Sequence, residues 1–252
     1  MTKDYKFLFQ ILDNYLVNKT DGIDKEILNA LEARSNGKSF SFKDHIKAFI
    51  YAQLSAVVAW KNVSKRKNEV NSLFFDFDKD KLKNTNPEIL IENIKKLKCY
   101  SSFTTKNQMN SLKTNIETFE KIEKDYGSLD NFIIHDKVSN VVKMLADNKS
   151  IYKLKYIGIE LVCEYLRNVG IDLIKPDKHI KRLISPQRLN LVNSEADYEI
   201  IDEFKDFADK VGLSQTKMDY LLWNYAARGY GEVCSASPKC YECVIRQFCN
   251  NG

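Results

Sequence analysis

Glycine and proline are scarce in this chain of 252 residues, which contains 9 Gly and 4 Pro. Turns depend on these residues, so the scarcity excludes a turn-rich all-β architecture. No apolar run reaches the roughly 18 residues of a membrane-spanning helix, because the longest, 48–60, is interrupted by Gln53 and Ser55. The first residues mix charged with apolar side chains and offer no small-residue cleavage site, so we expect no secretory signal. These absences predict an intracellular, all-α protein without a membrane partner.

The chain also lacks a large excess of either positive or negative side chains. Lys and Arg number 39 against 34 Asp and Glu, which gives a formal net charge of +5. This balance is typical of a lysine-rich surface and does not identify a partner. It allows binding to a polyanion if the positive side chains gather on one face. Hydrophobic residues make up 44% of the chain, which suffices for a packed core and excludes a disordered protein.

Cysteine is uncommon except near the end of the chain. Four of the six lie in the last nineteen residues with the spacing C-x5-C-x2-C-x5-C, namely Cys234, Cys240, Cys243 and Cys249. Disulfides do not fit an intracellular protein, because its compartment keeps thiols reduced. Four neighbouring thiolates repel one another unless a cation or cluster takes up their charge, so the pattern predicts a metal centre. Zinc and a four-iron cluster both remain open, and the long outer loops favour the larger iron cluster. Cys99 and Cys163 stand alone and are expected to be buried thiols.

Apolar residues recur at helical spacing through most of the chain. They predict helices over 4–18, 23–33, 106–124 and 136–147. Ser41, with Asp44 three residues later, predicts the start of a further helix, and Pro87 predicts the first turn of another. The polar segments 62–86 and 125–150 are expected to be connections.

The stretch from 151 to 183 predicts a helix-hairpin-helix. A short helix ending near Leu154 would be followed by a tight turn holding Gly158 and by a helix from Ile159 to Val169. The N–H groups at the start of such a helix can bind phosphates without reading base sequence. Because many helical turns contain one glycine, this motif alone is weak evidence.

Together with their neighbours, these motifs resemble the endonuclease III family of DNA glycosylases. Residues 154–162, LKYIGIELV, resemble the family hairpin L-P-G-V-G-x-K-T-A, and residues 176–183, PDKHIKRL, resemble V-D-T-H-I-x-R-V. The cysteine loop resembles the family's C-x6-C-x2-C-x5-C, with a first gap one residue shorter. Ala52 and Gln53 resemble the A-Q of the helix whose Gln fills the gap left by a flipped base. The motifs follow the family order, with extra residues between Gln53 and Gly158.

The resemblance implies an all-α, two-lobed, helix-hairpin-helix DNA glycosylase fold. Residues 34–171 would form a six-helix barrel domain, and residues 1–33 with 172–252 would form a helical iron–sulfur cluster domain. The four clustered cysteines would hold a [4Fe-4S] cluster, with zinc as the alternative. The protein would act in base excision repair as a cytoplasmic, nucleoid-associated monomer. Its partner would be double-stranded DNA with a damaged or mismatched base.

The resemblance also implies the residues of the site. Asp177 would be catalytic, because a fixed carboxylate stabilises the positive charge that develops on deoxyribose as the base leaves. The base would be flipped out of the duplex before its N-glycosidic bond is hydrolysed. The residues implied in DNA binding are Gln53, Lys155, Tyr156, Gly158, Lys178 and His179.

Four positions differ from members of the family. Glu160 stands where bifunctional members carry the lysine that forms a Schiff base with the sugar, and a carboxylate cannot form an imine. We therefore expect a monofunctional enzyme, resembling the alkylpurine-removing relatives; the alternative is that Glu160 is a solvated helix-face charge. Tyr156 replaces the first hairpin glycine and adopts positive φ poorly, and Lys155 replaces a proline. Ala48 stands where adenine-specific relatives carry a glutamate, which argues against that substrate.

Other functions stay open. The chain could be a bifunctional glycosylase and AP lyase that removes damaged pyrimidines by means of another lysine. It could also be an iron–sulfur protein that binds DNA without catalysis, or an interaction protein stabilised by zinc.

Overall fold

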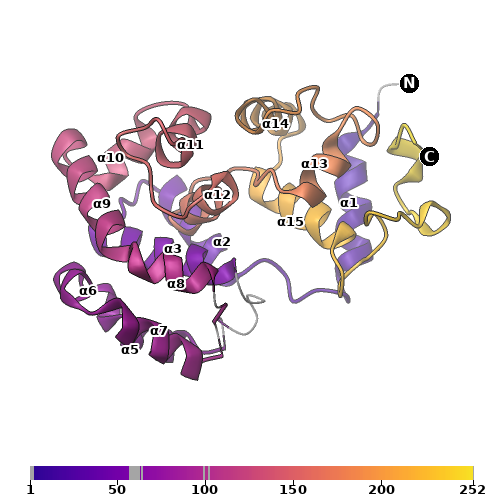
Figure 1. Ribbon diagram of the computed structural model, residues 1–252. Coiled ribbons are helices and arrows are strands. Elements are labelled where there is room, and N and C mark those ends of the chain that lie inside the picture. Colours follow the sequence, from indigo (N-terminus) through magenta and orange to yellow (C-terminus); the bar gives the residue numbers. More distant parts are fainter. Residues whose placement is uncertain (1–2, 57–62, 64, 99, 102, 252) are drawn as a thin grey trace. The chain divides into compact units, whose positions relative to one another are not determined.

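The computed structural model describes residues 3–56, 63, 65–98, 100–101 and 103–251 (Figure 1). These residues form 14 α-helices and three short 3-10 helices, and they contain no β-strand. The expected all-α class is therefore confirmed. Within the same ranges, no helix has the length and apolar content needed to cross a membrane.

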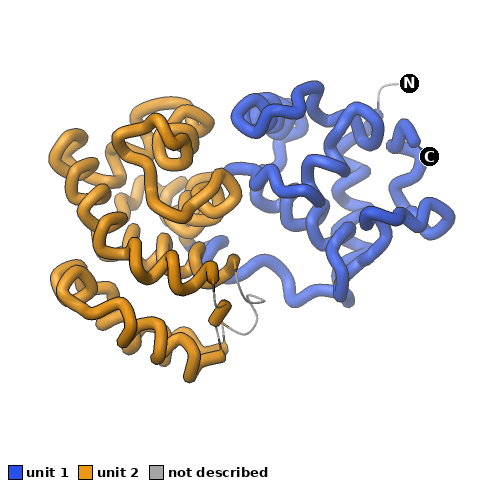
Figure 2. The backbone as a smooth tube through the Cα atoms, in the orientation of Figure 1, with its two compact units in different colours: residues 1–29, 172–252 blue, residues 30–171 orange. Residues whose placement is uncertain are grey.

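The chain divides into two compact units, which Figure 2 shows in different colours. Unit 1 contains residues 1–29 and 172–252, and unit 2 contains residues 30–171. The first boundary falls inside α2 (Lys25–Ser35), the helix in which the sequence placed its boundary between residues 33 and 34. The expected domains, 34–171 and 1–33 with 172–252, remain a prediction about independent folding and function.

Unit 1 is organised around α15. Its helices are α1 (Tyr5–Leu16), α13 (Lys178–Ile184), α14 (Asp197–Val211) and α15 (Gln215–Ala226), followed by the 3-10 helices η2 (Cys240–Glu242) and η3 (Arg246–Phe248). α15 packs against α1, α13 and α14. α1 buries Leu8, Leu12 and Leu16, whose spacing of four residues places them on one face of the helix.

Unit 2 is organised around α3 (Phe42–Ser55). All but five of its fourteen residues are buried, including an unbroken run from Ala48 to Leu54, as expected for a helix enclosed by neighbours. α3 contacts α8 (Thr104–Asn110), α10 (Leu129–Ile134) and α12 (Ile159–Asn168). The predicted cap is confirmed: the Ser41 hydroxyl accepts from the Asp44 N–H, and the Asp44 carboxylate accepts from the Ser41 N–H.

The remaining helices of unit 2 correct the predicted connections. Segment 62–86 contains α5 (Lys67–Leu73), η1 (Phe75–Phe77) and α6 (Lys79–Asn84), and α10 lies within segment 125–150. The predicted helix over 106–124 is divided at Ser111 into α8 and α9 (Leu112–Tyr126). α7 (Pro87–Lys96) begins at its proline as predicted, and α11 (Val138–Ala146) lies inside the predicted range. The short helices escaped prediction because their six or seven residues are too few to show a clear helical period.

A buried polar network ties four helices of unit 2 together. Arg34 Nη2 lies 2.6 Å from Asp130 Oδ1, and His45 Nε2 lies 3.4 Å from the same oxygen. His45 Nδ1 and the Tyr165 hydroxyl are 2.6 Å apart. Burial lowers the pKa of His45 below its ordinary value. Burial by itself would raise the pKa of the Asp130 carboxyl. Hydrogen bonds with His45 and Arg34 outweigh this effect and hold the pKa well below its usual range. Removing one partner leaves a buried charge uncompensated, so the network fixes how these helices pack.

We predict that Gly170→Ala destabilises unit 2 far more than Gly37→Ala. Both glycines have a left-handed φ, +80° and +82°, which costs an alanine about 1–2 kcal/mol. A Cβ at Gly170 would lie 2.3 Å from the carbonyl oxygen of Ala30, whereas a Cβ at Gly37 meets no atom within 4 Å. Overpacking therefore adds about 1–3 kcal/mol at Gly170 alone. Urea unfolding followed by circular dichroism measures both losses, and equal losses would contradict the close approach.

Candidate functional site

The hairpin differs from its predicted form at the first helix. α11 ends at Ala146, and the chain then runs through turns to α12, which begins at Ile159 as predicted. The described residues 147–158 contain no helix ending near Leu154. The Leu154 N–H instead donates to the Leu145 carbonyl over 3.0 Å, so this segment folds back onto the end of α11.

Two side chains hold the hairpin turn in shape. Asn115, fully buried in α9, accepts from the Lys155 N–H over 2.6 Å and donates to the Lys155 carbonyl over 3.1 Å. The Lys153 ammonium donates to the Ile157 carbonyl. Tyr156, between these anchors, has φ +56° and a side chain that is 59% exposed. The left-handed conformation that the family gives to glycine is therefore adopted here by a tyrosine.

The turn borders a groove of about 830 Å³ in unit 2. Lys155, Tyr156 and Gly158, three of the predicted DNA-binding residues, line it together with Lys153. Gly158 is the N-cap of α12 and supplies no capping side chain, so the first N–H groups of that helix remain available to an anion. Glu160 lies in the next turn, exposed to solvent. Burial, followed by the charge of Lys155, lowers the pKa of Lys153 below its ordinary value.

Asp177 caps α13 in unit 1. Its Oδ1 accepts from the backbone N–H groups of His179 and Ile180 over 2.8 and 3.0 Å, and the residue is 8% exposed. Among the described residues no group hydrogen-bonds to its Oδ2. One oxygen thus orients the carboxylate, while the other is left for a ligand. Asp177 is thus held in place as the N-cap of α13, and its catalytic role stays a prediction.

The neighbours of Asp177 include both predicted DNA-binding residues of unit 1, Lys178 and His179. Lys178 is exposed. His179 Nδ1 accepts from Arg182 Nη2 over 3.1 Å, and the His179 ring meets Trp223 edge-on at 6.0 Å between centroids. Burial lowers the pKa of His179, which favours the neutral ring. Arg182 also donates to the Cys234 carbonyl, which attaches α13 to the start of the cysteine loop.

Gln53 is fully buried in α3 of unit 2. Neither its amide nitrogen nor its amide oxygen has a hydrogen-bond partner among the residues that the structure describes. An unpartnered buried polar group costs about 1–3 kcal/mol, and such groups call for an explanation. Because Gln53 is fully buried, its side chain does not reach a surface that DNA could contact in this structure, and its role in DNA binding stays a prediction.

The four clustered cysteines line one small cavity in unit 1. Arg188 and Arg246 also line it. The Tyr225 hydroxyl donates to Cys243 Sγ over 3.3 Å and accepts from the Val244 N–H over 3.1 Å. Arg188 Nη1 donates to Cys234 Sγ over 3.6 Å.

The four cysteines are the residue type that binds zinc or an iron–sulfur cluster, but their present spacing does not form a metal site. Burial raises the pKa of the Cys234 thiol, and Arg188 and Arg182 act against this. No described cysteine forms a disulfide. As they stand, no three His, Cys, Asp or Glu side chains of the described residues are close enough to hold a metal ion. Cys163 is buried as predicted, and Cys99 lies outside the described residues.

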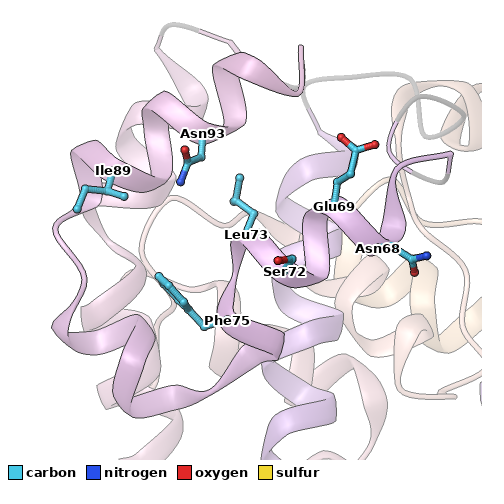
Figure 3. Close-up of a pocket in the computed structure, with 7 residues that line it drawn as sticks. All are labelled: Asn68, Glu69, Ser72, Leu73, Phe75, Ile89 and Asn93. Carbon is cyan, nitrogen blue, oxygen red and sulfur yellow. The ribbon is translucent and has the colours of Figure 1, made fainter.

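A second groove, which the sequence did not predict, has a volume of about 700 Å³ and lies between α5, η1 and α7 (Figure 3). Leu73, Phe75 and Ile89 contribute its apolar lining, and Glu69 contributes a carboxylate. Nothing in its lining indicates a reaction.

The chain is similar to proteins that excise oxidised guanine. No protein-family model matches it. A curated relative, the 8-oxoguanine DNA glycosylase/AP lyase of Aquifex aeolicus, is 30% identical over 114 residues, which are 43% of this chain and 49% of the relative. The chain thus matches about half the length of that relative.

Solved structures extend the similarity over most of the chain. The 8-oxoguanine DNA glycosylase of Thermotoga maritima superposes with a TM-score of 0.56 at 17% identity, covering 89% of this chain and 97% of the other. The Methanocaldococcus jannaschii enzyme, in complex with a 15mer DNA containing 8-oxoguanine, gives a TM-score of 0.53 at 20% identity over 88% and 98%. This chain has the fold of the 8-oxoguanine DNA glycosylases. The expected DNA glycosylase fold is confirmed, while the iron–sulfur domain stays a prediction.

Proposed function

We propose that this protein is a DNA glycosylase of base excision repair that removes an oxidised purine, with 8-oxoguanine as the first candidate. The observation that carries the proposal is Asp177, a nearly buried carboxylate with one oxygen fixed by two backbone N–H groups and the other without a partner. The glycosylase fold and the relatives named for 8-oxoguanine support the substrate class. The alkylated purines expected from Glu160 are the competing substrates.

In the proposed reaction the damaged nucleotide is flipped out of the duplex and its N-glycosidic bond breaks. Positive charge develops on the deoxyribose as the base departs with the bonding electrons. The Asp177 carboxylate stabilises that charge electrostatically. Water then adds its oxygen to the sugar carbon and releases one proton, and the departed base takes up a proton, so that the products are the free base and an abasic site. Lys155, Gly158 and Lys178 bind the phosphate backbone.

The name of the Aquifex relative includes a second activity, that of an AP lyase, which we do not propose for this chain. A lyase of this class needs an amine to form the sugar imine, and Glu160 offers a carboxylate at the family position. We therefore propose a monofunctional enzyme. If another lysine takes this role, Lys153 is the first candidate, because its amine lies in the hairpin and burial lowers its pKa.

We also propose a [4Fe-4S] cluster on the four clustered cysteines, with zinc as the alternative. When bound, the group would crosslink the loop that follows α15. Tyr225 and Arg188 support the proposal, because they donate hydrogen bonds to the sulfurs of Cys243 and Cys234 and so help to neutralise thiolate charge.

Asp177→Asn should lower base excision by about a hundredfold, as expected for the loss of an oriented charge. Asparagine caps helices about as well as aspartate, so the unfolding midpoint should change little. Asp78→Asn is the matched control, because Asp78 also caps a helix, α6. Single-turnover excision is measured on duplexes carrying one 8-oxoguanine, one alkylated purine or one damaged pyrimidine. If Asp177→Asn excises at the wild-type rate, Asp177 has no part in the chemistry.

The wild-type protein should release the base and leave an intact abasic strand that alkali then cuts. Borohydride should trap no covalent complex, whereas Glu160→Lys should produce trapping because it restores an amine at the family position. Glu117→Lys adds the same charge on α9 and should trap nothing. Efficient trapping by the wild-type chain that disappears in Lys153→Met would instead make Lys153 the nucleophile and the enzyme bifunctional.

Anaerobically purified protein should be brown and contain about four irons per chain. Cys240→Ser and Cys243→Ser should lose most of the iron, whereas Cys163→Ala should retain it, because Cys163 is buried in α12 of unit 2. Metal analysis and visible absorption measure both effects. One zinc per chain without visible absorption would establish the alternative metal.

A further inference from the structure

Tyr156 is held in a conformation that is unfavourable for its residue type. Its φ of +56° lies in the left-handed region, where a Cβ crowds the backbone and glycine pays no such cost. The conformation is imposed from both sides, by Asn115 on the Lys155 backbone and by Lys153 on the Ile157 carbonyl. The turn therefore presents the tyrosine in a fixed direction.

The fold gains little from this side chain. The ring is 59% exposed. Within the described part of the chain it stacks on no other aromatic ring, and its hydroxyl has no hydrogen-bond partner. By contrast, the ring of Tyr230, an exposed tyrosine of unit 1, packs against the ring of Trp223 with 5.5 Å between the centroids. Strained conformations persist where the surroundings enforce them, and they concentrate at functional sites.

The surroundings of Tyr156 suit a polyanion. The groove that Tyr156 lines also contains Lys153 and Lys155, and no carboxylate belongs to its described lining. Ser150 and Asn148 add polar groups. Phosphate oxygens are bound in proteins by lysine ammonium groups, by tyrosine hydroxyls and by backbone N–H groups, all of which this turn offers.

We propose that Tyr156 is a DNA-contacting residue whose ring packs against a deoxyribose of the strand bound by the hairpin and whose hydroxyl donates to a neighbouring phosphate. The proposal rests on the proposed function, since it assumes that the hairpin binds DNA. The contact reads no base, so it strengthens binding to damaged and undamaged duplexes alike. It also explains why a residue that strains the turn occupies the place of a glycine.

The proposal requires opposite changes in stability and binding from one substitution. Tyr156→Gly relieves the left-handed strain, so its thermal unfolding midpoint should rise. The same change should weaken binding to an undamaged duplex by about tenfold, a loss typical of one aromatic contact to nucleic acid. Asn190→Gly is the matched control, because Asn190 is also exposed with φ +56° but belongs to unit 1. It should raise the unfolding midpoint slightly and leave binding unchanged.

Two further variants separate the ring, the hydroxyl and the hairpin. Tyr156→Phe should retain most of the binding and lose the part due to the hydroxyl. Lys155→Ala should reduce the salt dependence of binding, because one phosphate contact is lost. Dissociation constants are measured by fluorescence anisotropy at several salt concentrations with a labelled undamaged duplex.

The outcomes distinguish this proposal from the proposed function. Weaker binding by Lys155→Ala with unchanged binding by Tyr156→Gly would overturn the role of Tyr156 and leave the hairpin as a DNA contact. Unchanged binding by both variants would remove the hairpin from the DNA interface and Tyr156 with it. Base excision by the same proteins tests the glycosylase activity independently.

Discussion

The buried amide of Asn115 supports the turn on which the candidate DNA contact depends. The N–H and C=O of Lys155 belong to no helix, and a buried backbone group without a partner is costly. Asn115 satisfies both groups with one side chain, over 2.6 and 3.1 Å. Its own helix, α9, buries Ile116 and Phe119 beside it. The turn is therefore attached to the packed interior of unit 2, and the positions of Tyr156 and Gly158 follow from that attachment.

The sequence predicted those parts of the fold that are specified by short local motifs. The cap at Ser41 and the start of α7 at Pro87 depend on nearby residues alone, and both are found. α5, α6 and α10 were missed because helices of six or seven residues are too short to show a clear period. The division between α8 and α9 was missed because Ser111 interrupts the helix without interrupting the hydrophobic pattern.

The candidate site was predictable to the extent that it follows sequential motifs. Asp177, Gly158 and the four clustered cysteines could be located because the residues around each match a spacing. Asn115 could not, because a lone asparagine in an amphipathic helix has no sequence signal, and its partner Lys155 is forty residues away. The same holds for Tyr225, whose hydroxyl reaches Cys243 only after α15 and the cysteine loop have packed. Contacts between distant segments are properties of the folded chain.

At positions 160 and 156 of the hairpin, this chain differs from the family that it resembles, and the two differences have opposite effects on stability. At position 160 a carboxylate in the first turn of α12 interacts favourably with the positive end of the helix dipole, typically by about 0.3–1 kcal/mol, where a lysine would interact unfavourably. The chain gains stability there and lacks the amine of a lyase. At position 156 a tyrosine occupies a left-handed conformation that favours glycine, so the chain loses stability and gains an exposed ring beside two lysines. Both differences agree with the proposed enzyme, which would bind DNA through the hairpin and leave the abasic strand uncut.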